Sequence, residues 1–164
     1  MKKLFIIVSM LFVLVGCGGK KDNRVKLDYE SMPTMEDSSS YLYQKYSLLS
    51  YELDSTAEYD VKINNKDSFL LFVYENVCYG CNLLAPALEP YITNNNVVLY
   101  TMPLSKISDK HDLYKAGVNT TPFLVIVSKG KVAYKELIDL PQDKKEHISW
   151  VEKWMEKHIE WSEN

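Results

Sequence analysis

One stretch in the middle of this sequence constrains the fold more than any other. It begins with SFLLFVY (68–74), which is apolar on both faces, as expected for a central strand covered on both sides. Two cysteines follow, Cys78 and Cys81, and the chain from Cys81 to Ile92 has apolar residues at helical spacing. Pro86 lies inside this helix, where its missing backbone donor predicts a kink. The stretch therefore predicts a buried strand that leads through a cysteine pair into an apolar helix.

The flanking segments predict the rest of an α/β domain. Residues 41–59 are ambiguous between strand and helix, although Ser55 and Glu58 have the capping-box spacing for a short helix. The C-terminal half predicts a strand, a short polar helix, a two-stranded hairpin and a long helix, over 97–102, 105–116, 123–127 with 131–138, and from Asp143 onward. The long helix is expected to bury one stripe: Ile148, Val151 and Met155, with Trp150 and Trp154 beside it. Right-handed crossover makes the first two strands parallel neighbours, and the hairpin adds antiparallel strands.

The position of Cys78, between a strand and a helix, has chemical consequences. At a helix N-terminus, unpaired backbone donors and the positive end of the helix dipole stabilise a thiolate. We therefore expect the pKa of Cys78 to lie below the free-thiol value of about 8.5. Cys81 lies one turn further on, where it is more sheltered and can attack a mixed disulfide formed at Cys78. Thiol–disulfide exchange needs this asymmetry between an exposed nucleophile and a sheltered resolving thiol.

Two segments resemble parts of the thioredoxin family. CYGCNLLAPALEPY (78–91) looks like the active-site helix of that family, with its kinking proline at Pro86. AGVNTTPFLVIVSKGKV (116–132) resembles the segment that contains the family's cis-proline, which corresponds to Pro122. The resemblance covers roughly residues 67–161. It implies a thioredoxin-like three-layer α/β sandwich with a central mixed sheet flanked by helices.

The same resemblance implies a thiol–disulfide oxidoreductase that acts on protein disulfide or dithiol substrates. It assigns the catalytic roles to Cys78 and Cys81, and it implies that Pro122 and Thr121 orient the substrate backbone. Tyr79, between the cysteines, is either a substrate contact or a solvated turn residue. We expect no cofactor and no bound metal. We also expect no nucleic-acid partner, because the mildly acidic chain, with a net charge of −3, has no basic cluster.

Two departures from the thioredoxin pattern leave the direction of electron flow open. Val77 stands where thioredoxins usually have tryptophan, and Phe72 stands where they have a buried acid that handles the proton of the resolving cysteine. Glu75 is a candidate substitute, but its charge near Cys78 opposes thiolate formation. An alternative is therefore a binding or accessory module with a weakly active dithiol, and the chain also loosely resembles bacteriocin transport accessory proteins.

Metal delivery and a structural disulfide are the remaining alternatives. A structural zinc site needs four ligands, and His147 and His158 are three helical turns, or about 16 Å, apart. His111 with the dithiol would resemble a copper-delivery site, but the spacing shows nothing specific, and we expect all three histidines to be solvated. A purely structural disulfide would close so short a loop that it stabilises the fold only modestly.

The N-terminus, MKKLFIIVSMLFVLVGCGGKK, predicts export. Two lysines precede an apolar run that is too short to span a bilayer, as in a secretory signal peptide. The end of the run, LVGC, resembles the cleavage box of bacterial lipoproteins, in which the cysteine, here Cys17, is lipidated. An ordinary signal peptide is the alternative. We predict a signal peptide at 1–17, a flexible tether at 18–40 and the thioredoxin-like domain at 41–164, lipid-anchored on the extracytoplasmic face of a bacterial membrane, where a membrane protein is a candidate electron donor.

Overall fold

The computed structural model describes residues 22–28, 41–46, 48–95 and 97–162. The predicted signal peptide with Cys17, and residues 18–21 and 29–40 of the predicted tether, lie outside these ranges. None of the helices within the described ranges has both the length and the apolar character needed to cross a membrane.

A five-stranded mixed sheet forms the centre of the molecule, in the strand order β2–β4–β3–β5–β6. β4 pairs in parallel with β2 and β3, whereas β5 pairs antiparallel with β3 and β6. The strands are β2 Tyr51–Glu52, β3 Phe69–Tyr74, β4 Leu99–Pro103, β5 Phe123–Ser128 and β6 Lys131–Leu137. The predicted parallel pair and the antiparallel hairpin are both confirmed.

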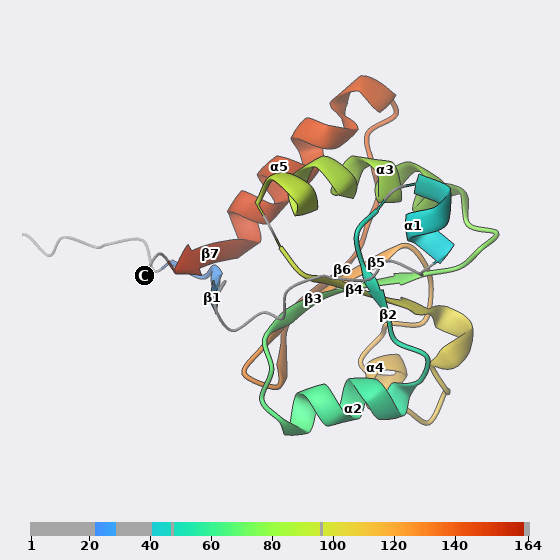
Figure 1. The fold of residues 1–164 in the computed structure, drawn as a ribbon, viewed down its shortest axis with the longest axis vertical. Coiled ribbons are helices and arrows are strands. Elements are labelled where there is room, and N and C mark those ends of the chain that lie inside the picture. Colours follow the sequence, from blue (N-terminus) through green and yellow to red (C-terminus); the bar gives the residue numbers. More distant parts are fainter. Residues whose placement is uncertain (1–21, 29–40, 47, 96, 163–164) are drawn as a thin grey trace, which may run out of the picture.

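Helices cover both faces of this sheet, so the predicted three-layer sandwich is confirmed (Figure 1). α3 and α5 pack against each other on one face together with α1, and α2 and α4 cover the other. The helices are α1 Tyr41–Tyr46, α2 Thr56–Asn64, α3 Tyr79–Asn94, α4 Asp112–Lys115 and α5 His147–His158, with 3-10 turns at Leu104–Lys106 and Lys144–Glu146.

β3 is the most deeply buried strand, and every one of its residues is inaccessible. Phe69 packs edge-on against Tyr59 of α2 and Tyr100 of β4 on one face. Phe72 and Tyr74, which point to the opposite face because strand side chains alternate, lie with ring centroids 6.0 Å apart. This double-sided burial explains why the strand is apolar on both faces.

The turn between β5 and β6 confirms the predicted hairpin. Lys129 and Gly130 both have positive φ, of 51° and 70°, which is the backbone geometry of a tight hairpin turn. A Cβ at Gly130 would also lie 2.2 Å from the carbonyl oxygen of Ile63, at the end of α2. Glycine is therefore required here for both its conformation and its close approach to α2.

The polar helix predicted over 105–116 is wrong. Only the turn at Leu104–Lys106 and the four-residue α4 are helical in this region. Between them, the Ser108 hydroxyl accepts a hydrogen bond from the backbone N–H of Lys110, at 3.2 Å. Such local side-chain bonds compete with helical hydrogen bonds, and α4 begins only where His111 caps the N–H of Leu113.

The C-terminal helix begins close to its predicted start but buries a different stripe. Asp143 caps a 3-10 turn by accepting from the N–H of Lys145, and α5 follows from His147. Val151, Trp154 and Met155 are buried as expected, whereas Ile148 is exposed. In this first turn His147 takes the buried position, and Ile148 instead lines a surface pocket.

The segment predicted as a tether contains a strand that packs on the domain. β1 (Val25–Asp28) pairs in parallel with β7 (Ile159–Ser162) in a separate two-stranded sheet beside α5 (Figure 1). Leu27 is buried in the main core, and the Ser128 hydroxyl donates to the carbonyl oxygen of Lys26, at 3.3 Å.

Leu27→Ala should therefore destabilise the domain although it lies in the predicted tether. Loss of a buried leucine side chain and the resulting cavity predict a decrease of about 2–4 kcal/mol in the free energy of unfolding. Lys26→Ala is the matched control, because this side chain is exposed and forms only a surface ion pair with Glu160; it should change stability by less than about 1 kcal/mol. Denaturant titration measures both, and equal stabilities would show that β1 is not part of the core.

Candidate active site

The two cysteines lie at the N-terminus of α3, where β3 delivers them. β3 ends at Tyr74, and after a short loop Cys78 takes an extended backbone conformation and caps α3. Cys78 and Cys81 form a disulfide, with their Cα atoms 5.2 Å apart. The backbone N–H of Cys81 lies 3.0 Å from Sγ of Cys78 and donates to it. The position predicted for Cys78, at the start of a helix, is confirmed.

The two cysteines are both buried, but they differ in exposure in the direction that the sequence predicts. Cys78 is 8% exposed and Cys81 only 1%. The first turn of α3 contains no acidic residue, so the positive end of the helix dipole is not neutralised from within the helix. In the reduced state, the N–H of Cys81 and the helix dipole both favour a thiolate at Cys78. The more exposed of the two cysteines is thus also the one whose thiolate the helix N-terminus stabilises.

A second loop meets the dithiol at Gly80. The Thr121–Pro122 peptide bond is cis, as the resemblance implies, and a Cβ at Gly80 would lie 2.8 Å from Cδ of Pro122. The carbonyl oxygen of Pro122 accepts a hydrogen bond from the N–H of Ile138, at 2.9 Å, which fixes the loop to the end of β6. The structure therefore brings the predicted residues Cys78, Cys81, Thr121 and Pro122 together, beyond the end of β3 and before the start of β5.

The surroundings of the dithiol are exposed and partly apolar. Val77 is 98% exposed and Tyr79 is 75% exposed, so both side chains are available to a bound chain. A pocket of about 290 Å³ precedes Cys78, between the loop at Glu75 and the end of β4 at Pro103. A second pocket of about 210 Å³ follows Cys81, and it is lined by Leu83, Pro86, Ala87, Lys144, His147 and Ile148.

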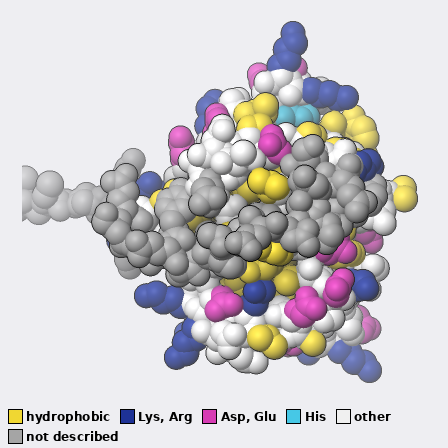
Figure 2. All heavy atoms as spheres, in the orientation of Figure 1, with side chains coloured by type: hydrophobic (Ala, Val, Ile, Leu, Met, Phe, Trp, Pro, Cys, Tyr) yellow, Lys and Arg dark blue, Asp and Glu magenta, His cyan; other side chains and the backbone are white. Residues whose placement is uncertain are grey.

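Charged side chains of both signs are interspersed over the described surface in Figure 2, with no single-sign patch on that face. This distribution agrees with the balanced composition of the chain. Electrostatic attraction to a polyanion would need a gathered basic surface.

Phe72 occupies the place of the buried acid, and a carboxylate enters from another strand. Phe72 is fully buried and pairs in register with Thr101, which pairs in turn with Glu52 on β2. Glu52 accepts a hydrogen bond of 2.7 Å from the Tyr74 hydroxyl. Glu75, the substitute considered from sequence, is exposed. Nothing in the local pattern around the cysteines indicated Glu52, because its contact to Tyr74 arises from the sheet.

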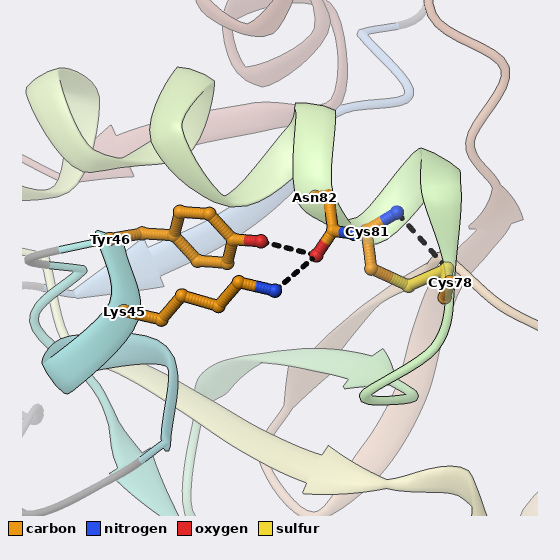
Figure 3. The surroundings of a disulfide bond; sticks show 5 residues. All are labelled: Lys45, Tyr46, Cys78, Cys81 and Asn82. Carbon is orange, nitrogen blue, oxygen red and sulfur yellow. Dashed lines mark hydrogen bonds between the residues drawn. A yellow bond between two sulfur atoms is a disulfide. The ribbon is translucent and has the colours of Figure 1, made fainter.

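The sequence also gave no indication of the contact between α1 and α3 (Figure 3). The side chains of Tyr46 and Lys45 both point toward Asn82, the residue after Cys81, and both donate to its Oδ1. The Lys45 Nζ–Asn82 Oδ1 distance is 3.0 Å. Residues separated by more than thirty positions thereby meet beside the dithiol.

The three histidines are not solvated as predicted. His147 is buried and bonded to the carbonyl oxygen of Pro141, and His111 caps α4 and contacts Asp60. His158 stacks on Tyr134 with ring centroids 4.0 Å apart, and burial lowers its pKa below 6.5. Each of these contacts is structural. Within the described ranges, no group of three or more histidine, cysteine or acidic side chains is arranged to hold a metal ion.

Comparisons with known proteins show the fold. No protein-family model and no curated protein matches the sequence. A solved chain from a study of the thiol-resolving mechanism of a yeast mitochondrial 1-Cys peroxiredoxin is 17% identical, with a TM-score of 0.51 over 68% of this chain and 96% of that one. Oxidised mitochondrial thioredoxin 3 from Saccharomyces cerevisiae is 17% identical, with a TM-score of 0.50 over 70% and 97%. Fasciola hepatica thioredoxin is 15% identical, with a TM-score of 0.50 over 66% and 98%. This chain has a thioredoxin fold.

Gly80→Ala should disturb the contact between the dithiol loop and Pro122. Alanine favours a helix over glycine by about 1 kcal/mol, but its Cβ would lie 2.8 Å from a proline ring that has no free rotamer. We expect a net loss of about 1–3 kcal/mol in the stability of the oxidised protein, measured by denaturant titration. The neighbouring Tyr79→Ala is the control, since this exposed side chain should contribute less than about 0.5 kcal/mol. A Gly80→Ala protein as stable as the unsubstituted chain would contradict the close packing on Pro122.

Proposed function

We propose that this protein is a thiol–disulfide oxidoreductase that exchanges disulfides with protein substrates. The observation that carries the proposal is the asymmetric dithiol at the N-terminus of α3, with Cys78 more accessible than Cys81 and bonded to its N–H. The contact of Gly80 with Pro122 supports it, because this contact places a second loop beside the sulfur atoms. The thioredoxin fold supplies the scaffold on which such a site is built.

Reduction of a substrate takes two exchange steps. The Cys78 thiolate attacks one sulfur of the substrate disulfide, which breaks the S–S bond and forms a mixed disulfide, while the other substrate sulfur leaves as a thiolate. The Cys81 thiol loses its proton to solvent, and its thiolate then attacks Cys78 Sγ and releases the second substrate sulfur. Two electrons pass to the substrate, its two thiolates take up protons from water, and the Cys78–Cys81 disulfide remains. The same steps in reverse oxidise a dithiol.

The residues around the dithiol, which we call the rim, have positioning roles in this proposal. They are Val77, Tyr79, Thr121 and Pro122. An extended substrate segment lies against Pro122, the backbone of Thr121 pairs with it, and Tyr79 contacts its side chains. Val77, almost fully exposed before Cys78, adds apolar surface at the same edge. These contacts hold the substrate sulfur in line with Cys78, which is the orientation that an exchange reaction needs.

We also propose that a lipid at Cys17 anchors the domain on the extracytoplasmic side of a bacterial membrane. The LVGC sequence at the end of a short apolar run supports this location. An oxidising compartment suits a chain whose remaining cysteines form one pair. A membrane protein that supplies electrons would then regenerate the dithiol after each reduction.

A binding module with a weakly active dithiol is the second candidate. Phe72, buried where an acid would handle the proton of Cys81, favours it, because β3 supplies no carboxyl group there. In this case the domain would bind a partner chain at the rim without catalysing repeated rounds of disulfide exchange. The two candidates differ in whether the mixed disulfide is resolved.

Cys-to-Ser variants of the full-length chain test the activity. The unsubstituted chain should reduce insulin in the presence of dithiothreitol, and Cys78→Ser should reduce the rate to that of dithiothreitol alone. Cys81→Ser should instead accumulate a mixed disulfide with the substrate, since the nucleophile is retained and the resolving thiol is lost. Mass spectrometry detects this adduct.

Thr93→Ala is the control for that experiment, because Thr93 lies at the end of α3 that is far from the dithiol, where its hydroxyl donates to Glu89. It should leave the rate of insulin reduction unchanged. If the unsubstituted chain shows no activity above dithiothreitol in either direction, and Cys81→Ser traps no adduct, the oxidoreductase proposal is wrong and the binding module is favoured.

The proposed anchor is tested by Cys17→Ala. This substitution removes the sulfur that would carry lipid, so the protein should lose lipid-dependent processing and move from the membrane to the soluble extracytoplasmic fraction. Cell fractionation and metabolic labelling with a fatty acid measure the change. Unchanged membrane association and processing would contradict lipidation, whatever the activity of the dithiol.

A further inference from the structure

The N-terminal helix α1 places a positive charge beside the dithiol. Lys45 and Tyr46 are the last residues of α1, and both donate to Oδ1 of Asn82. A carboxamide oxygen has two lone pairs, so this acceptor is fully used by the two donors. The Lys45 ammonium also lies over the Tyr46 ring, 4.9 Å from its centroid. Asn82 therefore holds the end of α1 in one place (Figure 3).

Asn82 belongs to the first turn of the helix that Cys78 caps. Its backbone N–H donates to the carbonyl oxygen of Cys78, at 3.1 Å, and it directly follows Cys81. Asn82 lies within one helical turn of both cysteines along α3, and its side chain holds the cation. The first turn of α3 has no charged residue of its own, so the ammonium adds to the positive end of the helix dipole there.

We propose that Lys45, held by Asn82, stabilises the thiolate form of the Cys78–Cys81 dithiol and so makes its disulfide easier to reduce. This inference rests on the proposed function, because it concerns how the same dithiol is tuned. Phe72 leaves the layer beneath the cysteines without a carboxyl group from β3, and α1 supplies a charge from outside the sheet instead. Asn82 is the positioning residue in this arrangement.

The sign of the effect follows from the charges of the two redox states. The disulfide is neutral, whereas the reduced form carries a thiolate, and a cation stabilises only the latter. Removal of the cation therefore favours the disulfide. Among the described residues, the other ionisable side chains around this end of α3 include Glu75 and Tyr79, both exposed, and Tyr46, which donates to Asn82. Glu52 accepts from the Tyr74 hydroxyl. Glu75 opposes the thiolate, so Lys45 acts against it.

The expected magnitude is modest, because Lys45 is exposed and solvent screens its charge. We expect a single charge in this position to shift the glutathione redox equilibrium about threefold to tenfold. Salt and pH dependence follow from the same cause. The effect should decrease at high ionic strength and at acidic pH, once the thiolate is protonated.

The test is the equilibrium of the full-length chain with reduced and oxidised glutathione, with the oxidised fraction measured by thiol alkylation. Lys45→Met removes the charge and keeps the stem, and it should stabilise the disulfide about threefold to tenfold at about pH 8. Lys45→Arg should restore the original equilibrium. Asn82→Ala should behave like Lys45→Met, and the double variant should show no further change, since Asn82 acts by holding the cation.

Two further variants separate charge from structure. Tyr46→Phe loses one hydrogen bond to Asn82 but keeps the cation, so its equilibrium should stay within about twofold of the original. Lys131→Met, at the start of β6 and at the opposite end of the sheet from the dithiol, is the matched charge control and should have no effect. Circular dichroism confirms that each variant is folded.

Two results would overturn the inference: a Lys45→Met equilibrium equal to that of the unsubstituted chain at low salt, or a shift of the same size at acidic pH. The glutathione equilibrium needs no protein substrate. A silent Lys45→Met therefore contradicts this inference even where insulin is reduced, whereas an inactive chain with a shifted equilibrium contradicts only the proposed function.

Discussion

The antiparallel pairing of β3 with β5 is the constraint on which the site depends. The last residues of β3 lie beside the first residues of β5, because these neighbouring strands run in opposite directions. The cysteines follow β3 and Pro122 precedes β5, so two segments about forty residues apart in sequence meet at one edge. Gly80 is the point of contact, and its lack of a side chain allows the loops to pack closely. The register of one strand pair thus determines which residues can share a substrate.

The charges around the dithiol come from different layers of the fold. The backbone of α3 supplies the helix dipole and the N–H of Cys81. The sheet beneath contributes no charge at Phe72, which is apolar and buried. Charged side chains reach the region from neighbouring elements: Glu52 from β2 to Tyr74, and Lys45 from α1 to Asn82. A dithiol of this kind can be retuned through the surrounding elements while the C-x-x-C motif and the core strand stay the same.

The parts of the fold that could be predicted are those with local sequence signals. The apolar run of β3, the cysteine spacing and the hairpin turn at Gly130 each predict their structure from neighbouring residues. β1 could not be predicted, because VKLD is short and lies in a polar segment, and it is ordered by pairing with β7 and by burial of Leu27. The α1 contact at Asn82 and the stacking of His158 on Tyr134 depend on side chains far apart in sequence, for which no periodicity exists.

The pairing of β1 with β7 fixes where the N-terminal segment leaves the domain. β7 lies at the far end of α3 from the dithiol, where Trp161 donates to the Tyr91 hydroxyl, at 2.9 Å. A chain from the proposed lipid at Cys17 to Val25 spans at most roughly 28 Å when fully extended. The domain would then stay close to the bilayer, with the dithiol at the end of α3 that is remote from the attachment point. Such a short connection favours partners that approach the domain from the side away from the membrane. It also means that a membrane protein must extend its own thiols well above the bilayer surface to reach the dithiol.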